Sequence, residues 1–142
     1  MEASLGSVRI LVVDDDPGVH RVLEDLLRFW GCEGVEVAAN GQEGVEKYRS
    51  FQPHVVIMDV DMPLMNGYQA SHAIVEMDPQ AAVILLTGLP DSRSARRALQ
   101  QRLARVIIPK PFQFEQLRMA IEEALRERAP VAPVRKGAGA VA

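Results

Sequence analysis

The chain has a single cysteine, few aromatic residues and no long apolar run. Cys32 stands alone among 142 residues, so an internal disulfide is excluded and a reducing, cytoplasmic compartment is expected. We interpret Cys32 as a small buried apolar residue. No apolar run approaches the ~18 residues of a membrane span. The first residues also lack the basic and apolar stretches of a secretory signal.

Charge is distributed unevenly along the chain. Residues 1–92 carry 5 basic against 15 acidic side chains, and residues 93–142 carry 11 basic against 4 acidic ones. Such asymmetry can mark a surface for nucleic acid or an acidic partner. Aromatic residues make up 5% of the chain, and none alternates with the arginines to stack on bases. We therefore expect no direct nucleic-acid binding, and interpret Arg93, Arg96, Arg97 and Arg102 as the solvated face of a helix.

Short runs of aliphatic and β-branched residues recur along the chain. Four of these runs end at polar residues, and the first ends at two of them. Such runs are typical of strands buried in a parallel sheet. Because ligands bind outside the carboxyl ends of strands in open parallel sheets, we predict that the closing residues share one site. These residues are Asp14 and Asp15, Asp59, Thr87 and Lys110.

Helical patterns alternate with the strand patterns five times. After the first strand, apolar residues recur with helical spacing from Val19 to Trp30, with Asp16 as a predicted cap and Pro17 at the first position. Asn40 is a second predicted cap, for a helix that ends near Phe51. The alternation predicts an α/β fold, a doubly wound parallel sheet with helices on both faces. With 48% hydrophobic residues, the chain can build one such core. We place this domain at residues 8–128, between a flexible segment 1–7 and a flexible tail or linker stub 129–142.

The residues that close the strands favour the chemistry of phosphoryl transfer. Crowded carboxylates repel one another unless a cation lies among them, and hard oxygen ligands favour Mg²⁺ over Zn²⁺. His20, His54 and His72 neither end strands nor show ligand spacing. A carboxylate nucleophile with a divalent ion, a lysine and a hydroxyl around it could accept a phosphoryl group.

Four motifs resemble the receiver domain of two-component response regulators, in the order and at the spacings of that family. They are Ile10–Pro17 (ILVVDDDP), Val56–Gly67 (VIMDVDMPLMNG), Leu85–Gly88 (LLTG) and Pro109–Phe112 (PKPF). The resemblance spans roughly residues 8–128. It implies a flavodoxin-like three-layer sandwich whose five parallel strands lie in the order 2-1-3-4-5.

The resemblance also implies roles for individual residues. Asp59 would be the phosphoacceptor, and Asp15, Asp59 and the backbone carbonyl of Asp61 would bind Mg²⁺ directly. Asp14 would act on the ion largely through water. Thr87 would hydrogen-bond the phosphoryl group and Lys110 would pair with it, next to a Lys110–Pro111 bond that is usually cis in the family.

The implied partners are a sensor histidine kinase or phosphotransfer protein as donor, and a downstream protein that binds the face formed by the fourth helix, fifth strand and fifth helix. The chain would be a monomer or a phosphorylation-dependent homodimer. Ile107 stands where the family often has an aromatic switch residue. An interaction module that no longer uses phosphate is therefore one alternative. A second alternative is a haloacid-dehalogenase-type phosphatase, suggested by Asp59-Val60-Asp61, although its acidic pair would lie upstream rather than downstream.

Overall fold

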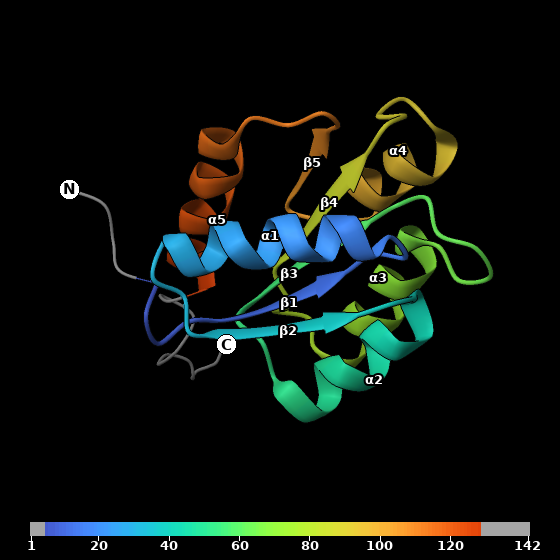
Figure 1. Cartoon of the computed structure of the whole chain (residues 1–142). Helices are drawn as coiled ribbons and strands as arrows, with labels where there is room; N and C mark the ends of the chain where they lie inside the picture. The colour runs from blue at the N-terminus through green and yellow to red at the C-terminus, as the bar shows by residue number, and fades with distance from the viewer. Residues whose placement is uncertain (1–4, 129–142) are drawn as a thin grey trace.

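The computed structural model describes residues 5–128 and contains one five-stranded sheet with a helix after each strand (Figure 1). All neighbouring strands are parallel, in the order β2-β1-β3-β4-β5, which confirms the predicted fold. The strands are β1 (Arg9–Val13), β2 (Gly34–Ala38), β3 (Val55–Asp59), β4 (Val83–Thr87) and β5 (Val106–Pro109). The helices are α1 (Pro17–Phe29), α2 (Gly41–Phe51), α3 (Gly67–Met77), α4 (Arg93–Gln100) and α5 (Phe114–Arg128).

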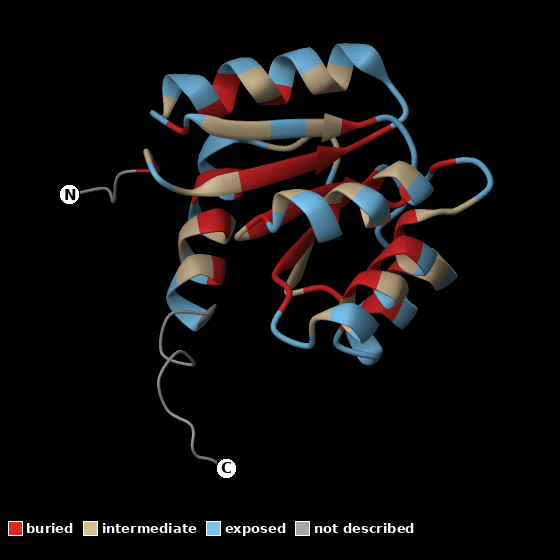
Figure 2. Ribbon diagram, turned by 90° about the horizontal axis from the view of Figure 1, so that it is seen from below, coloured by how far each residue is buried: buried red, intermediate tan, exposed pale blue. Residues whose placement is uncertain are grey.

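Alternation of side chains along the strands divides the core into two layers. Ile10 and Val12 of β1 point to the layer beneath α1 and α5, whereas Leu11 and Val13 point to the layer beneath α2, α3 and α4. Figure 1 shows these two groups of helices on opposite faces of the sheet. The central strands β1, β3 and β4 are almost wholly buried, and exposed residues cover the outer helix faces (Figure 2).

Side-chain caps fix where the helices begin. They thereby fix the ends of the loops that connect the strands to the helices. Asp16 accepts a hydrogen bond from Gly18 N (2.8 Å) and Asn40 accepts one from Glu43 N (2.8 Å), so both predicted caps are confirmed. Asn66 forms a reciprocal capping box with Gln69 at the start of α3. Ser92 caps α4 by accepting from Ala95 N. Each cap satisfies a backbone N–H that the first helical turn leaves unpaired.

Two residues outside the helices and strands, Cys32 and Leu5, are buried in the core beneath α1 and α5. Cys32 is buried with 1% exposure, as predicted, and burial raises the pKa of its thiol above the ordinary value. Leu5 departs from the expected flexible segment 1–7, because its side chain has 0% exposure and lies in the core beneath α1 and α5. A turn closed by the hydrogen bond from Val8 N to Leu5 O (3.1 Å) directs it inward. The predicted tail 129–142 lies outside the described residues.

Candidate functional site

The register of the strands brings the predicted site residues to one edge of the sheet. Val13 pairs with Met58, so Asp14 and Asp59 follow at the same level on neighbouring strands. Thr87 pairs with Pro109, which places Lys110 one residue beyond the level of Thr87, directly after the end of the edge strand β5. Parallel strands with aligned carboxyl ends thus gather residues that are far apart in the sequence.

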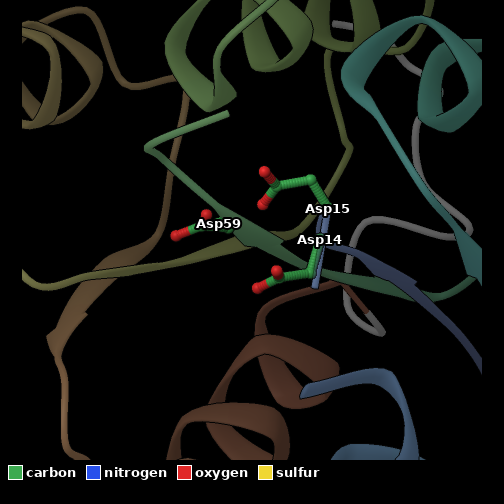
Figure 3. A group of neighbouring side chains, drawn as sticks. All are labelled: Asp14, Asp15 and Asp59. Carbon is green, nitrogen blue, oxygen red and sulfur yellow. The ribbon is translucent and has the colours of Figure 1, made fainter. Parts of the chain in front are cut away.

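Three carboxylates form the centre of this edge. One carboxylate oxygen from each of Asp14, Asp15 and Asp59 lies within 4.8 Å of the others. Figure 3 shows the side chains of Asp14 and Asp15, from the end of β1, gathered with that of Asp59 from β3. Asp14 and Asp59 are buried, with 2% and 5% exposure, whereas Asp15 is exposed. The cluster is therefore a partly enclosed, acidic set of oxygen ligands.

Lys110 is the cation that meets this cluster. Its Nζ lies 3.0 Å from Asp59 Oδ1, in a hydrogen bond, and 3.6 Å from Asp14 Oδ2. The Lys110–Pro111 peptide is cis, as the resemblance implies. The backbone N–H of Lys110 donates to Thr87 O (2.8 Å), so β4 holds the position from which the lysine reaches the carboxylates.

One lysine does not neutralise the cluster. Burial raises the pKa of Asp59 above its ordinary value, and the charge of Asp14 adds to this effect, although the hydrogen bond from Lys110 opposes it. Burial likewise raises the pKa of Asp14, against a hydrogen bond from Asp16 N. Burial alone would lower the pKa of Lys110, but the hydrogen bond and charge of Asp59, with Asp14, hold it above the usual value. The ionised carboxylates are thus short of compensating positive charge.

Thr87 lies at the same edge but is engaged elsewhere. Its side chain has 0% exposure, and its hydroxyl donates to Asp61 Oδ2 at 2.9 Å. The hydroxyl oxygen of Thr87, Oγ1, also accepts a hydrogen bond from Leu89 N at 2.9 Å. The side chain of Asp61 therefore points to Thr87, an interaction that the strand pattern alone did not reveal.

Backbone packing supports the position of Asp59. Gly67 begins α3 beneath the end of β3, where an added Cβ would lie 2.4 Å from Asp59 O and 2.8 Å from Val60 Cα. On the other side, His20 Nε2 contacts the backbone oxygens of Asp14 and Ala38. Because both oxygens are acceptors, Nε2 must carry the proton. His20 thus supports the end of β1 and offers no lone pair to a metal from this nitrogen.

Comparison with known proteins identifies the family. The model of the response regulator receiver domain matches residues 10–122. The chain belongs to this family. The receiver domain is similar to the chemotaxis protein CheY of Thermotoga maritima, at 37% identity over 105 residues that cover 74% of this chain and 87% of the relative. The CheY protein of Bacillus subtilis is 37% identical over 117 residues, which cover 82% of this chain and 97% of the relative.

Solved structures agree with this assignment. A receiver domain protein from Clostridium thermocellum matches with a TM-score of 0.82 and 29% identity, over 87% of this chain and 98% of that one. A CheX–CheY–BeF3–Mg complex from Borrelia burgdorferi matches with a TM-score of 0.75 and 26% identity, over 82% and 87%. Receiver domains of this type are signalling domains that bind Mg²⁺ at an aspartate cluster, not classical enzymes, so the phosphatase alternative is set aside.

Within residues 5–128, none of the helices has the length and apolar character needed to cross a membrane.

Proposed function

We propose that this receiver domain accepts a phosphoryl group on Asp59 from the phosphohistidine of a sensor histidine kinase or phosphotransfer protein. The observation that carries the proposal is that Asp59 lies within the cluster of three carboxylates and also accepts a hydrogen bond from Lys110. We assign Mg²⁺ binding to Asp15, Asp59 and the backbone carbonyl of Asp61, with Asp14 acting largely through water. Thr87 and Lys110 contact the phosphoryl group.

The donor set fits Mg²⁺. Carboxylates and a carbonyl are hard oxygen ligands, and the exposed Asp15 leaves a path for water. The raised pKa values of Asp14 and Asp59 fit the same role, because a buried carboxylate cluster gains most from an added cation. When bound, a divalent ion would supply positive charge against the oxygens of the phosphoryl group.

Asp59 performs the bond-making step. One of its carboxylate oxygens attacks phosphorus, the new O–P bond forms as the P–N bond to the partner's imidazole breaks, and the electron pair leaves with the imidazole nitrogen. Lys110, now 3.0 Å from Asp59, is placed to pair with the negative charge on the transferred group. The Thr87 hydroxyl can donate to a phosphoryl oxygen once it leaves Asp61. Water later hydrolyses the acyl phosphate and restores the carboxylate.

The output surface we propose is the face formed by α4, β5 and α5. Arg93, Arg96 and Arg97 are exposed on α4, and this agrees with their interpretation as a solvated helix face. Arg102 is also exposed, but it was wrongly placed on this helix, because α4 ends at Gln100. Phosphorylation would shift the balance between two conformations of this face, and a downstream protein that prefers one of them would respond. The proposal includes a cytoplasmic location and a monomer or phosphorylation-dependent homodimer.

Intact-protein mass after incubation with acetyl phosphate tests the phosphoacceptor directly. We expect a Mg²⁺-dependent gain of one phosphoryl group, absent in Asp59→Asn. A matched control is Asp25→Asn, which removes an exposed carboxylate from α1 and should still gain the group. Beryllofluoride binding with Mg²⁺ should be measured on the same samples, because rapid hydrolysis would hide the covalent product.

The same experiment separates the remaining alternative. Ile107 is half-buried and packs against the core beneath α2, α3 and α4, so the usual aromatic side chain is absent from this position. If the wild type neither gains a phosphoryl group nor binds beryllofluoride, the phosphoacceptor proposal is wrong. The chain would then be an interaction module whose partner binding survives Asp59→Asn unchanged.

A further inference from the structure

The hydroxyl of Thr87 is already occupied. A threonine hydroxyl has one proton to donate, and in this structure Thr87 donates it to Asp61 Oδ2 at 2.9 Å. Asp61 lies in the loop after β3, two residues beyond the proposed phosphoacceptor, and its side chain is exposed at the mouth of the site. A phosphoryl group on Asp59 would have to accept its hydrogen bond from the same hydroxyl proton that Thr87 now donates to Asp61.

We propose that Asp61 is a positioning residue that holds Thr87 in its resting orientation and competes with the phosphoryl group for the Thr87 hydroxyl. This inference rests on the proposed function, since it concerns how the same site responds to phosphate. Hydrogen bonds to an ionised acceptor are roughly twice as strong as neutral ones. The free energy needed to break the bond between Thr87 and Asp61 therefore reduces the net stabilisation that Thr87 gives to a phosphoryl group.

Hydrogen bonds connect this contact to α4. Thr87 Oγ1 accepts from Leu89 N at 2.9 Å, and Leu89 O in turn accepts from Ser92 N at 3.0 Å. Ser92 is the cap of α4, and its side chain accepts from Ala95 N at 3.2 Å. Movement of the Thr87 hydroxyl from Asp61 to a phosphoryl group would thus alter the start of α4. This route needs no aromatic side chain at Ile107.

A simpler effect of Asp61 must be separated from this one. The carboxylate of Asp61 also repels an anion bound at Asp59 through space, whatever Thr87 does. The two effects differ in one respect: competition requires the Thr87 hydroxyl, and repulsion does not. A double-mutant cycle between the two positions distinguishes them.

The cycle compares wild type, Asp61→Ala, Thr87→Val and the double variant, with the dissociation constant of beryllofluoride measured in saturating Mg²⁺. We expect Asp61→Ala to bind beryllofluoride about two- to tenfold more tightly than wild type, the range for loss of one ordinary competing hydrogen bond, because water around the exposed Asp61 weakens the advantage of its charge. In the Thr87→Val background the same substitution should change the constant by less than about twofold. Equal tightening in both backgrounds, or none in either, would overturn the proposal.

Nuclear magnetic resonance of the ligand-free protein provides a second readout. Asp61→Ala should shift the Thr87 methyl signal and the amide signals from Leu89 to Ser92, and Asp61→Asn, which keeps a neutral acceptor, should shift them less. Asp25→Ala removes a carboxylate from α1 and should leave these signals unchanged. Unmoved signals in Asp61→Ala would overturn the proposal. This readout needs no phosphate analogue, so it stands even if the wild type fails to bind beryllofluoride and the phosphoacceptor proposal falls.

Discussion

Lys110 Nζ donates to Asp59 Oδ1 at 3.0 Å, across 51 positions of sequence and from the end of the edge strand β5 to the central strand β3. The contact follows from the register, because β5 aligns with β4 and β4 with β3 at the same edge. It joins the proposed nucleophile to the end of β5, which is part of the proposed output face. A change of charge at Asp59 would therefore change the position of Lys110 and of the end of β5.

Replacing Lys110 tests this connection. We predict that Lys110→Ala keeps much of the Mg²⁺ affinity, because the carboxylates remain and lose a competing cation. The variant should, however, show weaker propagation of beryllofluoride binding to α4, β5 and α5, measured as amide chemical-shift changes in those elements. Lys47→Ala, which removes a lysine from α2 near Glu36 and Glu43, is the matched control. Shift changes as large in Lys110→Ala as in wild type would contradict the prediction.

The buried carboxylates predict how the stability of metal-free protein depends on pH. Burial is the main cause that raises the pKa of Asp14 in the folded state, whereas an unfolded aspartate titrates near a pKa of about 3.9. Between these values the folded state binds more protons, so the free energy of unfolding contributed by Asp14 falls as pH rises. The stabilisation that Asp14 contributes is fully present below the pKa of the unfolded state. It is lost as pH rises through the higher pKa of the folded state.

Urea unfolding in a chelator at several pH values from about 4 to 7 measures this effect. Asp14→Asn should show a smaller loss of stability with rising pH and should be more stable than wild type near neutral pH. Mg²⁺ should then stabilise wild type by mass action and stabilise Asp14→Asn less. Parallel pH profiles for the two proteins would show that Asp14 is not the source of the dependence.

Close packing at Gly67 predicts a steric effect on the site. A methyl group there would lie 2.4 Å from Asp59 O, so the loop after β3 must move to admit it. We expect Gly67→Ala to lower the free energy of unfolding by about 1–3 kcal/mol, as overpacking does, and to slow phosphorylation of the displaced Asp59. Gly88→Ala is the control for stability, since its Cβ would meet nothing within 4 Å. A Gly67→Ala protein as stable as Gly88→Ala would contradict the close contact.

Strand order and the edge residues could be predicted because each depends on a local pattern. Apolar runs gave the strands, the polar residues that close them gave the positions of Asp59 and Lys110, and the rule for parallel sheets joined them. The bond between Thr87 and Asp61 could not be predicted in this way. It depends on the rotamer of a side chain in an irregular loop, for which no periodicity exists. The resemblance to the family implied the backbone carbonyl of Asp61 as a ligand, and no sequence pattern indicated its side-chain contact with Thr87.

Buried Arg118 was missed for a related reason. A charged residue in a helix is expected on the solvent side, yet Arg118 has 5% exposure. Its Nε donates to Glu122 Oε2 at 2.8 Å, and its guanidinium lies 5.4 Å from the centre of the Trp30 ring. The spacing of Arg118 and Glu122, four residues apart, was the available signal. The contact with Trp30, the residue that caps the end of α1, could not be predicted, because it depends on how α5 packs against α1.

Leu5 gives a prediction about where the folded domain begins. Its side chain is fully buried in the core beneath α1 and α5, before the first strand starts. Truncation of a buried leucine removes apolar contacts and leaves a cavity, so Leu5→Ala should lower the free energy of unfolding by about 2–5 kcal/mol. Leu64→Ala is the matched control, because Leu64 is fully exposed and its truncation should change stability by less than about 0.5 kcal/mol. Equal stability of the two variants in urea would mean that Leu5 is peripheral to the core and that the domain begins at residue 8, as the sequence alone suggested.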